Sequence, residues 1–442
     1  MKKNFINITN MIIRKIAVIY FALLATFTLF IILTFTIPTS GIKDNLIKSV
    51  EQINEEGLWY KPMGIYLFQI DNMTDCIMMD INACADSENP VRSAMITNYV
   101  LPDEDNSTPA YENITGKTFD ILINGQKKSD NINNYARYWH GYQVILRPLF
   151  LFFNYNQIRI LNYIIFTLLA AISIVMLYKV LGSGYALTFL AALVLSNTMI
   201  VPLAIQFSTC FYISIIAMLI FLTRPKFAHD TEKSIIIFFI TGAVTSYMDF
   251  LTTPILTLGF PLIVAAAISA GSRNMAKNIA MQSISWFGGY ALLWSSKWMM
   301  AWILTGENVV DSAIGSARLR MGNTIVFGGF EMTMNEFFDI ITTKISSIIN
   351  PLWILFIIFV LIIIATTYIY INRQRMSNER WLFMIAIMPL LWFTIMKNHS
   401  LQHIFFTWRD WILTLWCIMI FMCNNKKKTH SNNENRSPDT LL

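Results

Sequence analysis

Long hydrophobic runs separated by short polar segments dominate this chain. The first run extends from Ile16 to Pro38, which is enough for a helix of about 20 residues to cross a bilayer core of about 30 Å. It is longer than the apolar region of a signal peptide, and no small-residue cleavage site follows it. We therefore interpret this run as a membrane-spanning helix that the protein retains.

Nine more apolar runs follow, so the pattern predicts an all-α polytopic membrane protein with about ten transmembrane helices. The predicted spans are Ile16–Pro38, Arg159–Leu177, Tyr185–Ala204, Ile205–Leu222, Ser234–Met248, Ile255–Ala270, Ile279–Leu304, Leu352–Ile371, Trp381–Met396 and Ile404–Met422. The predicted organisation is an N-terminal segment (1–15), the first span (16–38), a large loop (39–143), spans two to seven (144–304), a second loop (305–350), spans eight to ten (351–422) and a polar, disordered tail (423–442).

Lysine and arginine cluster in the short connections, and under the ten-span interpretation all the clusters fall on one side. They are Lys2, Lys3, Arg14 and Lys15; Arg224, Lys226 and Lys233; Arg273 and Lys277; Arg373, Arg375 and Arg380; and Lys426, Lys427 and Lys428. Because cytoplasmic loops carry this excess, we expect both termini in the cytoplasm and the protein in a bacterial inner membrane. The loops 39–143 and 305–350 would then face outward.

Composition supports this class: 55% of the residues are hydrophobic, and the mean hydropathy is +0.50. The net charge of +6 follows from the loop bias, so it argues little for a nucleic-acid partner. No phosphate-binding glycine loop or zinc motif occurs in a fitting context. Two of the five cysteines, Cys76 and Cys84, lie in the first outer loop, where an oxidising compartment would permit a disulfide.

Two carboxylates four residues apart, Asp71 and Asp75, follow an apolar stretch in the first outer loop. On a helix they share a face, where they could act as a general base and as a ligand for a metal or hydroxyl group. A solvated surface turn explains them equally simply, because this loop is rich in acids. Apolar flanking residues favour the functional interpretation, since they indicate packing.

A run of aromatic and cationic residues precedes the second predicted span. It includes Arg137, Tyr138 and His140, and Arg147 follows shortly after. Interfacial aromatic residues often only anchor helices. However, an anchor needs neither an imidazole nor two guanidinium groups, whereas a lipid phosphate or pyrophosphate does. We expect these residues on the phosphate side of a site.

Asp249 lies at the tip of a predicted helical hairpin, and Lys297 lies in the outer half of the seventh span. Charged residues at membrane depth indicate function unless they are paired or hydrated. Asp249 could instead cap the next helix. Lys297 could extend to the interface, or it could present its charge to a lipid-linked phosphate.

The last polar cluster contains His399, His403 and Arg409. The two histidines are four residues apart, which suits metal coordination or a proton relay. The predicted helix supplies no third ligand, so hydrogen bonding to a substrate or a carboxylate is the favoured interpretation. No cofactor is indicated, and a divalent cation remains open.

The chain resembles the GT-C class of integral-membrane glycosyltransferases. The resemblance rests on a first span followed by a large outer loop with Asp71 and Asp75, a segment Ala136-Arg137-Tyr138 returning to the membrane, and many helices with short cytoplasmic turns. The plan is similar to that of the phage-encoded glucosyltransferases that modify bacterial O-antigen. The resemblance implies a polyprenyl-phosphate-linked sugar donor, a glycan or lipid-linked acceptor, and an acidic base in the first outer loop. The common pattern places that acid closer to the first span, so the acting carboxylate stays open.

We therefore expect inverting sugar transfer at the outer bilayer surface, in modification of O-antigen or another cell-envelope polysaccharide. Asp71 or Asp75 would deprotonate the acceptor, and Arg137, His140, Lys297 and Arg409 would neutralise the departing phosphate. The alternative is a transporter or flippase for a lipid-linked or anionic substrate. That class favours polar residues along a transmembrane path and internal repeats, neither of which the sequence displays.

Overall fold

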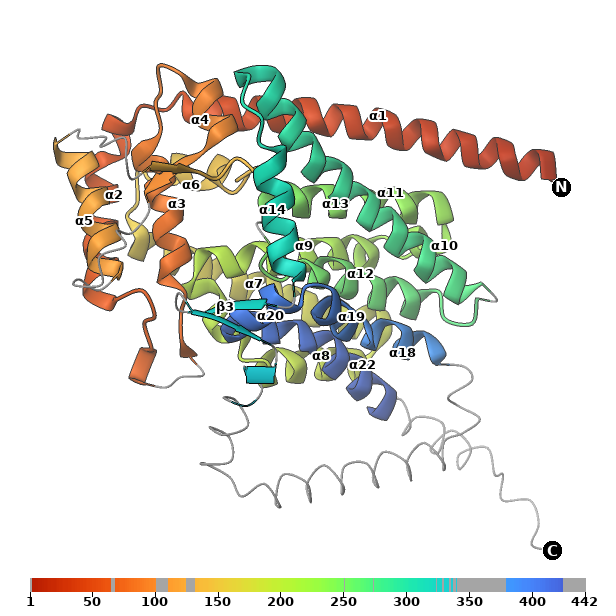
Figure 1. Cartoon of the computed structure of the whole chain (residues 1–442). Helices are drawn as coiled ribbons and strands as arrows, with labels where there is room; N and C mark the ends of the chain where they lie inside the picture. Colours follow the sequence, from red (N-terminus) through yellow and green to blue (C-terminus); the bar gives the residue numbers. More distant parts are fainter. Residues whose placement is uncertain are drawn as a thin grey trace, which may run out of the picture.

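The computed structural model describes residues 2–64, 68–100, 110–124, 132–249, 251–272, 274–322, 324–327, 330–333, 335–336, 339 and 379–423, and over these residues the protein is all-α with two short antiparallel strand pairs. The predicted span Leu352–Ile371 lies outside the described residues. So do most of the tail after Met422 and the cations Arg273, Arg373 and Arg375. The helices run alongside one another, with the first loop gathered at one end (Figure 1).

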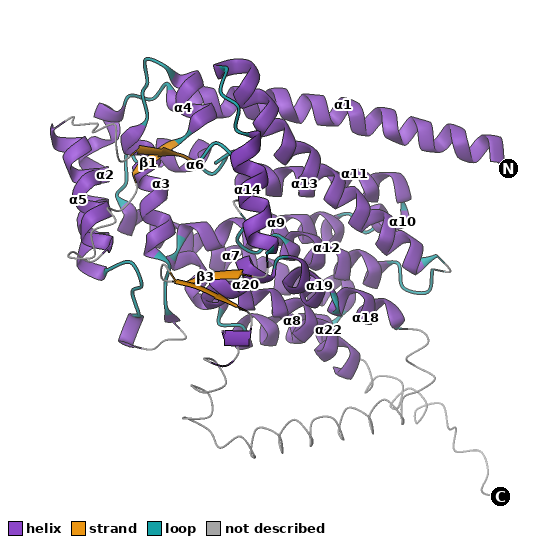
Figure 2. Ribbon diagram, in the orientation of Figure 1, coloured by secondary structure: helices purple, strands orange, loops and turns teal. Residues whose placement is uncertain are grey.

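The first large loop folds into short helices and one pair of strands (Figure 2). Its elements are α2 (Thr39–Glu56), η1 (Pro62–Gly64), α3 (Asn72–Cys84), α4 (Pro90–Ile96), β1 (Asn98–Val100), α5 (Ala110–Asn124) and β2 (Ile132–Asn134), followed by α6 (Gln143–Leu149). In the antiparallel β1–β2 pair, Tyr99 pairs with Asn133. This region shares a buried apolar core with the helical body, in which Ile42 and Met79 lie with Leu251 and Met396. The loop therefore packs directly onto the helices.

The helical body contains the remaining elements. They are α1 (Lys2–Phe35), α7 (Tyr155–Leu181), α8 (Ser183–Leu195), η4 (Thr198–Leu203), α9 (Ile205–Thr223), α10 (Lys226–His229), α11 (Thr231–Met248), α12 (Ile255–Ile268), α13 (Met275–Thr305), α14 (Val310–Met321), β3 (Thr324–Phe327), β4 (Phe330–Thr333), α18 (Arg380–Ala386), α19 (Met388–Ile395), α20 (Lys397–Gln402), α21 (Ile404–Thr407), η5 (Trp408–Trp411) and α22 (Ile412–Cys423). The strands β3 and β4 form a hairpin, which is also antiparallel.

Three helices are long and apolar enough to cross a membrane: Asn10–Phe35 within α1, Tyr155–Leu181 and Ile205–Thr223. Their ends agree with the predicted runs to within a few residues. Side chains such as Phe21 and Ile164 on two of these helices are exposed, as expected for a lipid-facing surface. The structure thus supports membrane association and these three spans.

Several other predicted spans are shorter than the pattern suggested. The run Tyr185–Ala204 does not form one helix, because α8 ends at Leu195 and Asn197 turns the chain with φ of 49°. Its 13 residues are about 20 Å long, less than a hydrocarbon core of about 30 Å. Likewise, Trp381–Met396 divides at Ile387 into α18 and α19, with Pro389 at the start of α19.

The first two clusters of lysine and arginine, which the sequence assigns to the cytoplasmic side, lie at one end of the molecule. Lys15 of α1 forms an ion pair with Glu232 at the start of α11. The α10 connection and the N-terminus lie at the end opposite α2 and α5 (Figure 1). The two clusters therefore share a side, as the ten-span interpretation requires of them.

A disulfide between Cys76 and Cys84 does not form. Both residues lie on the single helix α3. Eight helical residues rise about 12 Å, whereas a disulfide requires Cα atoms within about 7 Å. The helical geometry of α3 therefore excludes a disulfide between Cys76 and Cys84, which the sequence had left possible.

Two glycines allow α11 and α13 to approach each other closely. A Cβ atom at Gly242 would lie 1.9 Å from the Trp286 carbonyl oxygen, and one at Gly289 would lie 2.1 Å from the Phe239 carbonyl oxygen. Small residues allow this backbone contact between membrane helices. The contact fixes how the two helices are positioned along their axes, and with them the polar groups at their outer ends.

We predict that Gly289→Ala destabilises the protein by at least about 1–3 kcal/mol, as overpacking of a close contact does. Gly288→Ala is the matched control, because no atom lies within 4 Å of a Cβ placed there. Thermal unfolding in detergent should show a lower midpoint for Gly289→Ala only. Equal midpoints for the two variants would contradict the backbone contact.

Candidate functional site

Asp71 and Asp75 both lie in the buried start of α3. Asp71 caps this helix by accepting hydrogen bonds from the Thr74 backbone N–H (3.0 Å) and the Thr74 hydroxyl (2.6 Å). It also accepts one from the side chain of Gln206. The two aspartates are at most 1% exposed, so a solvated turn is excluded.

Asp75 caps a different helix, α9. Its carboxylate accepts hydrogen bonds from the backbone N–H groups of Ile205 (2.8 Å) and Gln206 (3.2 Å). Helix α9 needs this partner because its own N-cap, Ala204, has no side chain that can accept a bond. A buried anion at a helix N-terminus is also favoured by the helix dipole.

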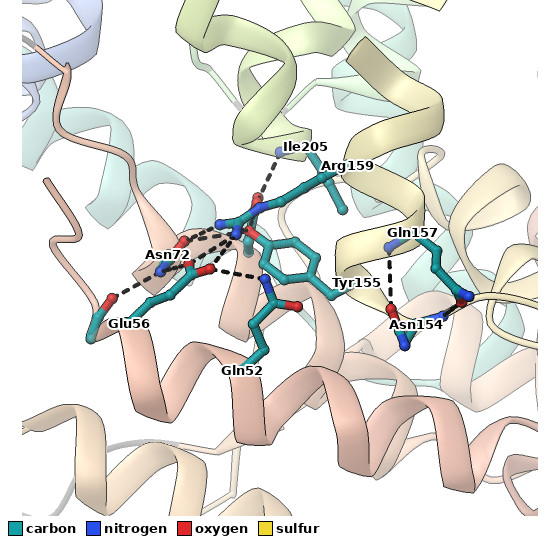
Figure 3. A network of polar contacts seen from close by, with 10 residues as sticks. Gln52, Glu56, Asn72, Asn154, Tyr155, Gln157, Arg159 and Ile205 are labelled. Carbon is teal, nitrogen blue, oxygen red and sulfur yellow. Dashed lines mark hydrogen bonds and ion pairs between the residues drawn. The ribbon is translucent and has the colours of Figure 1, made fainter. Parts of the chain in front are cut away.

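Arg159 links the outer loop to α7 through a dense set of polar contacts (Figure 3). Its Nη1 donates to both carboxylate oxygens of Glu56 at 2.8 Å, and its Nη2 donates to Asn72 Oδ1 at 2.6 Å. Nη2 also donates to the Tyr155 hydroxyl at 2.9 Å. Tyr155 in turn donates to Asp75, so one hydroxyl joins the guanidinium to the carboxylate.

The acids in this network have different ionisation behaviour. Burial raises the pKa of Asp75 to about 6, although bonds from Tyr155 and the α9 N–H groups and the Arg159 charge oppose the rise. Burial likewise raises the pKa of Asp71. For Glu56, burial is outweighed by the Arg159 charge and hydrogen bonds, and its pKa is lowered. Glu56 therefore stays ionised near neutral pH, where Asp75 can gain or lose its proton.

Asp80 is a third buried acid on α3. It accepts a hydrogen bond from the Thr118 hydroxyl, and burial raises its pKa to about 8. It is therefore mostly protonated at pH 7, which makes it a poor general base.

An apolar groove of about 410 Å³ adjoins the network on the outer surface of α7. The groove is lined by Tyr60, Pro62, Ile70, Asn156, Arg159, Ile160, Tyr163, Ile164 and Leu203. Among the described residues that line the groove, Arg159 is the charged one. The Nε of Arg159 is buried and has no hydrogen-bond partner within the described residues. The groove thus combines an apolar wall on a membrane-spanning helix with a guanidinium group.

A second cluster surrounds Tyr138. Arg320 of α14 donates to the Tyr138 hydroxyl at 2.8 Å, and the guanidinium of Arg137 lies 5.5 Å from the same ring. Trp294 and Trp298 both donate to the Arg137 carbonyl, at 2.7 and 3.1 Å. Two guanidinium groups therefore flank one aromatic ring near the start of the helical body.

Three of the predicted phosphate-binding groups are already bound to the protein. All five N–H groups of Arg147 donate to protein oxygens, on Ile37, Thr39 and Asn82. The buried ammonium of Lys297 donates to the Ala94 and Met95 carbonyls at the end of α4.

His140 is the third of these groups. It contacts the Tyr142 hydroxyl and the Tyr135 carbonyl through its two ring nitrogens. Burial lowers the pKa of His140 to about 3, so this ring is neutral at physiological pH. A neutral His140 cannot neutralise a departing phosphate, which is the role that the sequence predicted for it.

Asp249 is the C-cap of α11 and closes the hairpin turn, but it does not cap the next helix, because the N-cap of α12 is Pro254 and α12 has no side-chain cap. It accepts hydrogen bonds from the backbone N–H groups of Leu251 (2.8 Å) and Thr252 (3.0 and 3.2 Å), and from the Thr252 hydroxyl. The Leu251 carbonyl contacts His399 Nε2 at 2.6 Å. The segment containing His399 therefore packs directly on this tip.

The ring centroids of His399 and His403 lie 4.8 Å apart with the rings tilted by 52°. Both rings are neutral because burial lowers their pKa values, that of His403 to about 4. Among the described residues, no group of three or more metal-ligating side chains of the His, Cys, Asp and Glu types occurs. Arg409 is buried, with its guanidinium 4.9 Å from the Trp408 ring and 5.8 Å from that of Phe207.

The aspartates and the aromatic, cationic segment pack against each other. Cys76 and Met79 of α3 lie in the same apolar cluster as Tyr138 and Tyr142. The Tyr142 hydroxyl, which contacts His140 Nδ1 at 2.9 Å, is also close enough to Asp75 for an electrostatic interaction. Asp75 and Arg409 both touch the start of α9. Asp75 binds its first amides, and Arg409 lies against Phe207.

Sequence reasoning missed the partners that complete the network. Arg159 was treated as the boundary of a span, although a charge there is itself a signal of function. Glu56 and Asn72 gave no signal, because their contact with Arg159 joins residues 103 and 87 positions apart. Asp410 stood beside Arg409 in the sequence but was passed over.

Comparison of the chain with protein-family models, with curated proteins and with solved structures gives no match.

We predict that Arg147→Lys lowers the free energy of unfolding by about 2–4 kcal/mol, because buried acceptors left unpaired cost about 1–3 kcal/mol each. The matched control is Arg92→Lys, since Arg92 forms only an exposed ion pair with Glu307. The control should cost less than about 1 kcal/mol. Denaturant titration in detergent measures both, and equal losses would contradict the structural role of Arg147.

Proposed function

We propose that this protein is an integral-membrane glycosyltransferase of the GT-C type. It transfers a sugar from a polyprenyl-phosphate donor to a glycan or lipid-linked acceptor on the outer face of a bacterial inner membrane, in modification of O-antigen or another envelope polysaccharide. In this proposal the chain has about ten spans, and both termini lie in the cytoplasm.

The observation that carries the proposal is the position of the α7 groove. Its apolar wall lies on a membrane-spanning helix, and Arg159 lies both in its lining and in the network that contains Asp75. A polyprenyl phosphate has a matching form, a long apolar chain that ends in an anion. Arginine binds phosphate well because its planar donors pair with two oxygens.

In the proposed reaction, the donor phosphate replaces Glu56 at the Arg159 guanidinium. Asp75 accepts the proton of the acceptor hydroxyl, and the acceptor oxygen forms a bond to the anomeric carbon of the donor. The bond from that carbon to the phosphate oxygen breaks, and the phosphate leaves with the electron pair. Arg159 stabilises the charge that develops on the phosphate. Asp71 positions the site through Gln206.

The choice of Asp75 follows from its pKa of about 6 and its link through Tyr155 to Arg159. A general base works best when its pKa lies near the working pH. Asp80 is mostly protonated, and Glu56 is held ionised by the cation. Asp75 is thus the carboxylate in this region that best suits proton transfer.

We predict that transfer of radiolabelled sugar from a polyprenyl-phosphate donor to host envelope glycan, by the purified protein in nanodiscs, depends on ionised Asp75. Below pH 6 the rate should fall about tenfold per pH unit, because the base form is lost, and above pH 7 it should be level. Asp75→Asn should lower the rate by about 10²- to 10⁴-fold. The exposed Asp44→Asn is the matched control.

The pH profile of the unaltered protein tests the role of Asp75 as the base without a substitution. This test remains valid even if Asp75→Asn weakens the cap of α9. A rate that is constant from pH 5 to 7 would contradict the assignment. Movement of the lipid-linked sugar across liposomes without any product would instead support the transporter or flippase alternative.

We also predict that filling the groove weakens donor binding. Ile164→Trp places a bulky ring among the lining residues, so KM for the lipid donor should rise about tenfold or more, as the loss of about 1.4 kcal/mol of binding implies, with little change in kcat. Ile172 lies two turns further along the same helix and is similarly exposed, so Ile172→Trp is the control. Identical donor KM values for the two variants would remove the groove from the mechanism.

A further inference from the structure

Three segments that meet at the tip of the α11–α12 hairpin contain an unusual number of buried polar atoms without hydrogen-bond partners. The segments are the α11–α12 connection, α20 and η5. Seven buried side-chain atoms in these segments and in the last turn of α11 have no hydrogen-bond partner within the described part of the chain: Ser246 Oγ, Thr253 Oγ1, Asn398 Oδ1, His399 Nδ1, Ser400 Oγ and both carboxylate oxygens of Asp410. Buried polar atoms are normally paired, so such a group indicates a missing ligand or ordered water.

Specific contacts hold these segments together. His399 Nε2 contacts the Leu251 carbonyl at 2.6 Å, and the Thr407 hydroxyl donates to the Ser400 carbonyl at 2.7 Å. Asp410 lies close enough to Asp249 for their carboxylates to interact electrostatically. The unsatisfied atoms therefore belong to one small region at the outer ends of the helices.

The chemistry of these atoms is biased toward acceptors. Asn398 Oδ1 only accepts, and the Asp410 carboxyl offers at least one accepting oxygen whether or not it carries a proton. His399 is neutral and directs Nε2 at a carbonyl oxygen, so this nitrogen carries the proton and Nδ1 is an acceptor. The serine and threonine hydroxyls can act in either role. A complementary ligand must bring several donors.

We propose that this region is a sugar-binding subsite, in which Asp410 accepts hydrogen bonds from hydroxyl groups of one hexose ring. The inference rests on the proposed function, which it deepens, because the sugar belongs either to the lipid donor or to the acceptor glycan. A ring with several hydroxyl groups supplies the donors that the region lacks. Phe207, beside Phe406 and Arg409, connects the region to the α9 turn that Asp75 caps.

Asp410 has no evident structural task. It is fully buried, and neither of its oxygens has a hydrogen-bond partner in the residues that the structure describes. A buried carboxylate without a partner destabilises a protein. Sites that keep such a group at the expense of stability are typically binding or catalytic sites.

The test uses the full-length protein in detergent and saturation-transfer NMR with free glucose, galactose and N-acetylglucosamine as probes. The unaltered protein should give a signal with at least one probe. Asp410→Asn should weaken that binding about 10- to 100-fold, because an amide NH₂ group, which cannot accept a hydrogen bond, replaces one of the two carboxyl oxygens. Its unfolding midpoint should stay the same or rise, whereas a structural role for Asp410 would lower it.

This binding test needs no transfer activity, so it can succeed or fail independently of the glycosyltransferase proposal. In the transfer assay, a higher KM for the lipid donor in Asp410→Asn assigns the subsite to the donor sugar, and a higher KM for the glycan assigns it to the acceptor. The inference is overturned by equal sugar binding in the two proteins. It is also overturned if Asp410→Asn abolishes the binding of Ca²⁺ or Mn²⁺ and leaves sugar binding unchanged.

Discussion

The capping of α9 by Asp75 is the interaction on which the outer half of the molecule depends. A buried helix N-terminus must find an acceptor for its first amides, and here the acceptor comes from the outer loop, 130 residues earlier in the chain. This single requirement fixes α3 against α9. It also directs the other groups, because Tyr155, Arg159 and Asn72 all reach their positions through contacts with the same carboxylate or its neighbours.

Cations that look alike in the sequence have different tasks in the structure. Arg147 and Lys297 bind carbonyl oxygens where helices end, which stabilises the junction between the outer loop and the helical body. Arg159 shares its charge between Glu56 and a groove on the lipid-facing surface. The number of protein oxygens that already surround each cation distinguishes these tasks. Residue type and membrane depth alone do not.

Local pattern was sufficient for the long apolar helices, since length and hydrophobicity determine α1, α7 and α9 directly. Apolar neighbours also favoured burial of Asp71 and Asp75, although a solvated turn stayed an alternative until their contacts were seen. Local pattern failed where one residue interrupts a run, as Asn197 does before η4. It failed again for the Glu56–Arg159 pair, because this contact follows from packing between segments remote in sequence.

The five bonds of Arg147 bear on how the protein is assembled. They join the carbonyl of Ile37, just after the first helix, to Asn82 at the end of α3, but the guanidinium itself belongs to α6. During synthesis the first helix and most of the outer loop emerge before α6 does. The bonds of Arg147 can therefore form only once the first helix, α3 and α6 have all been made, so the last of the three to be synthesised completes the junction between them.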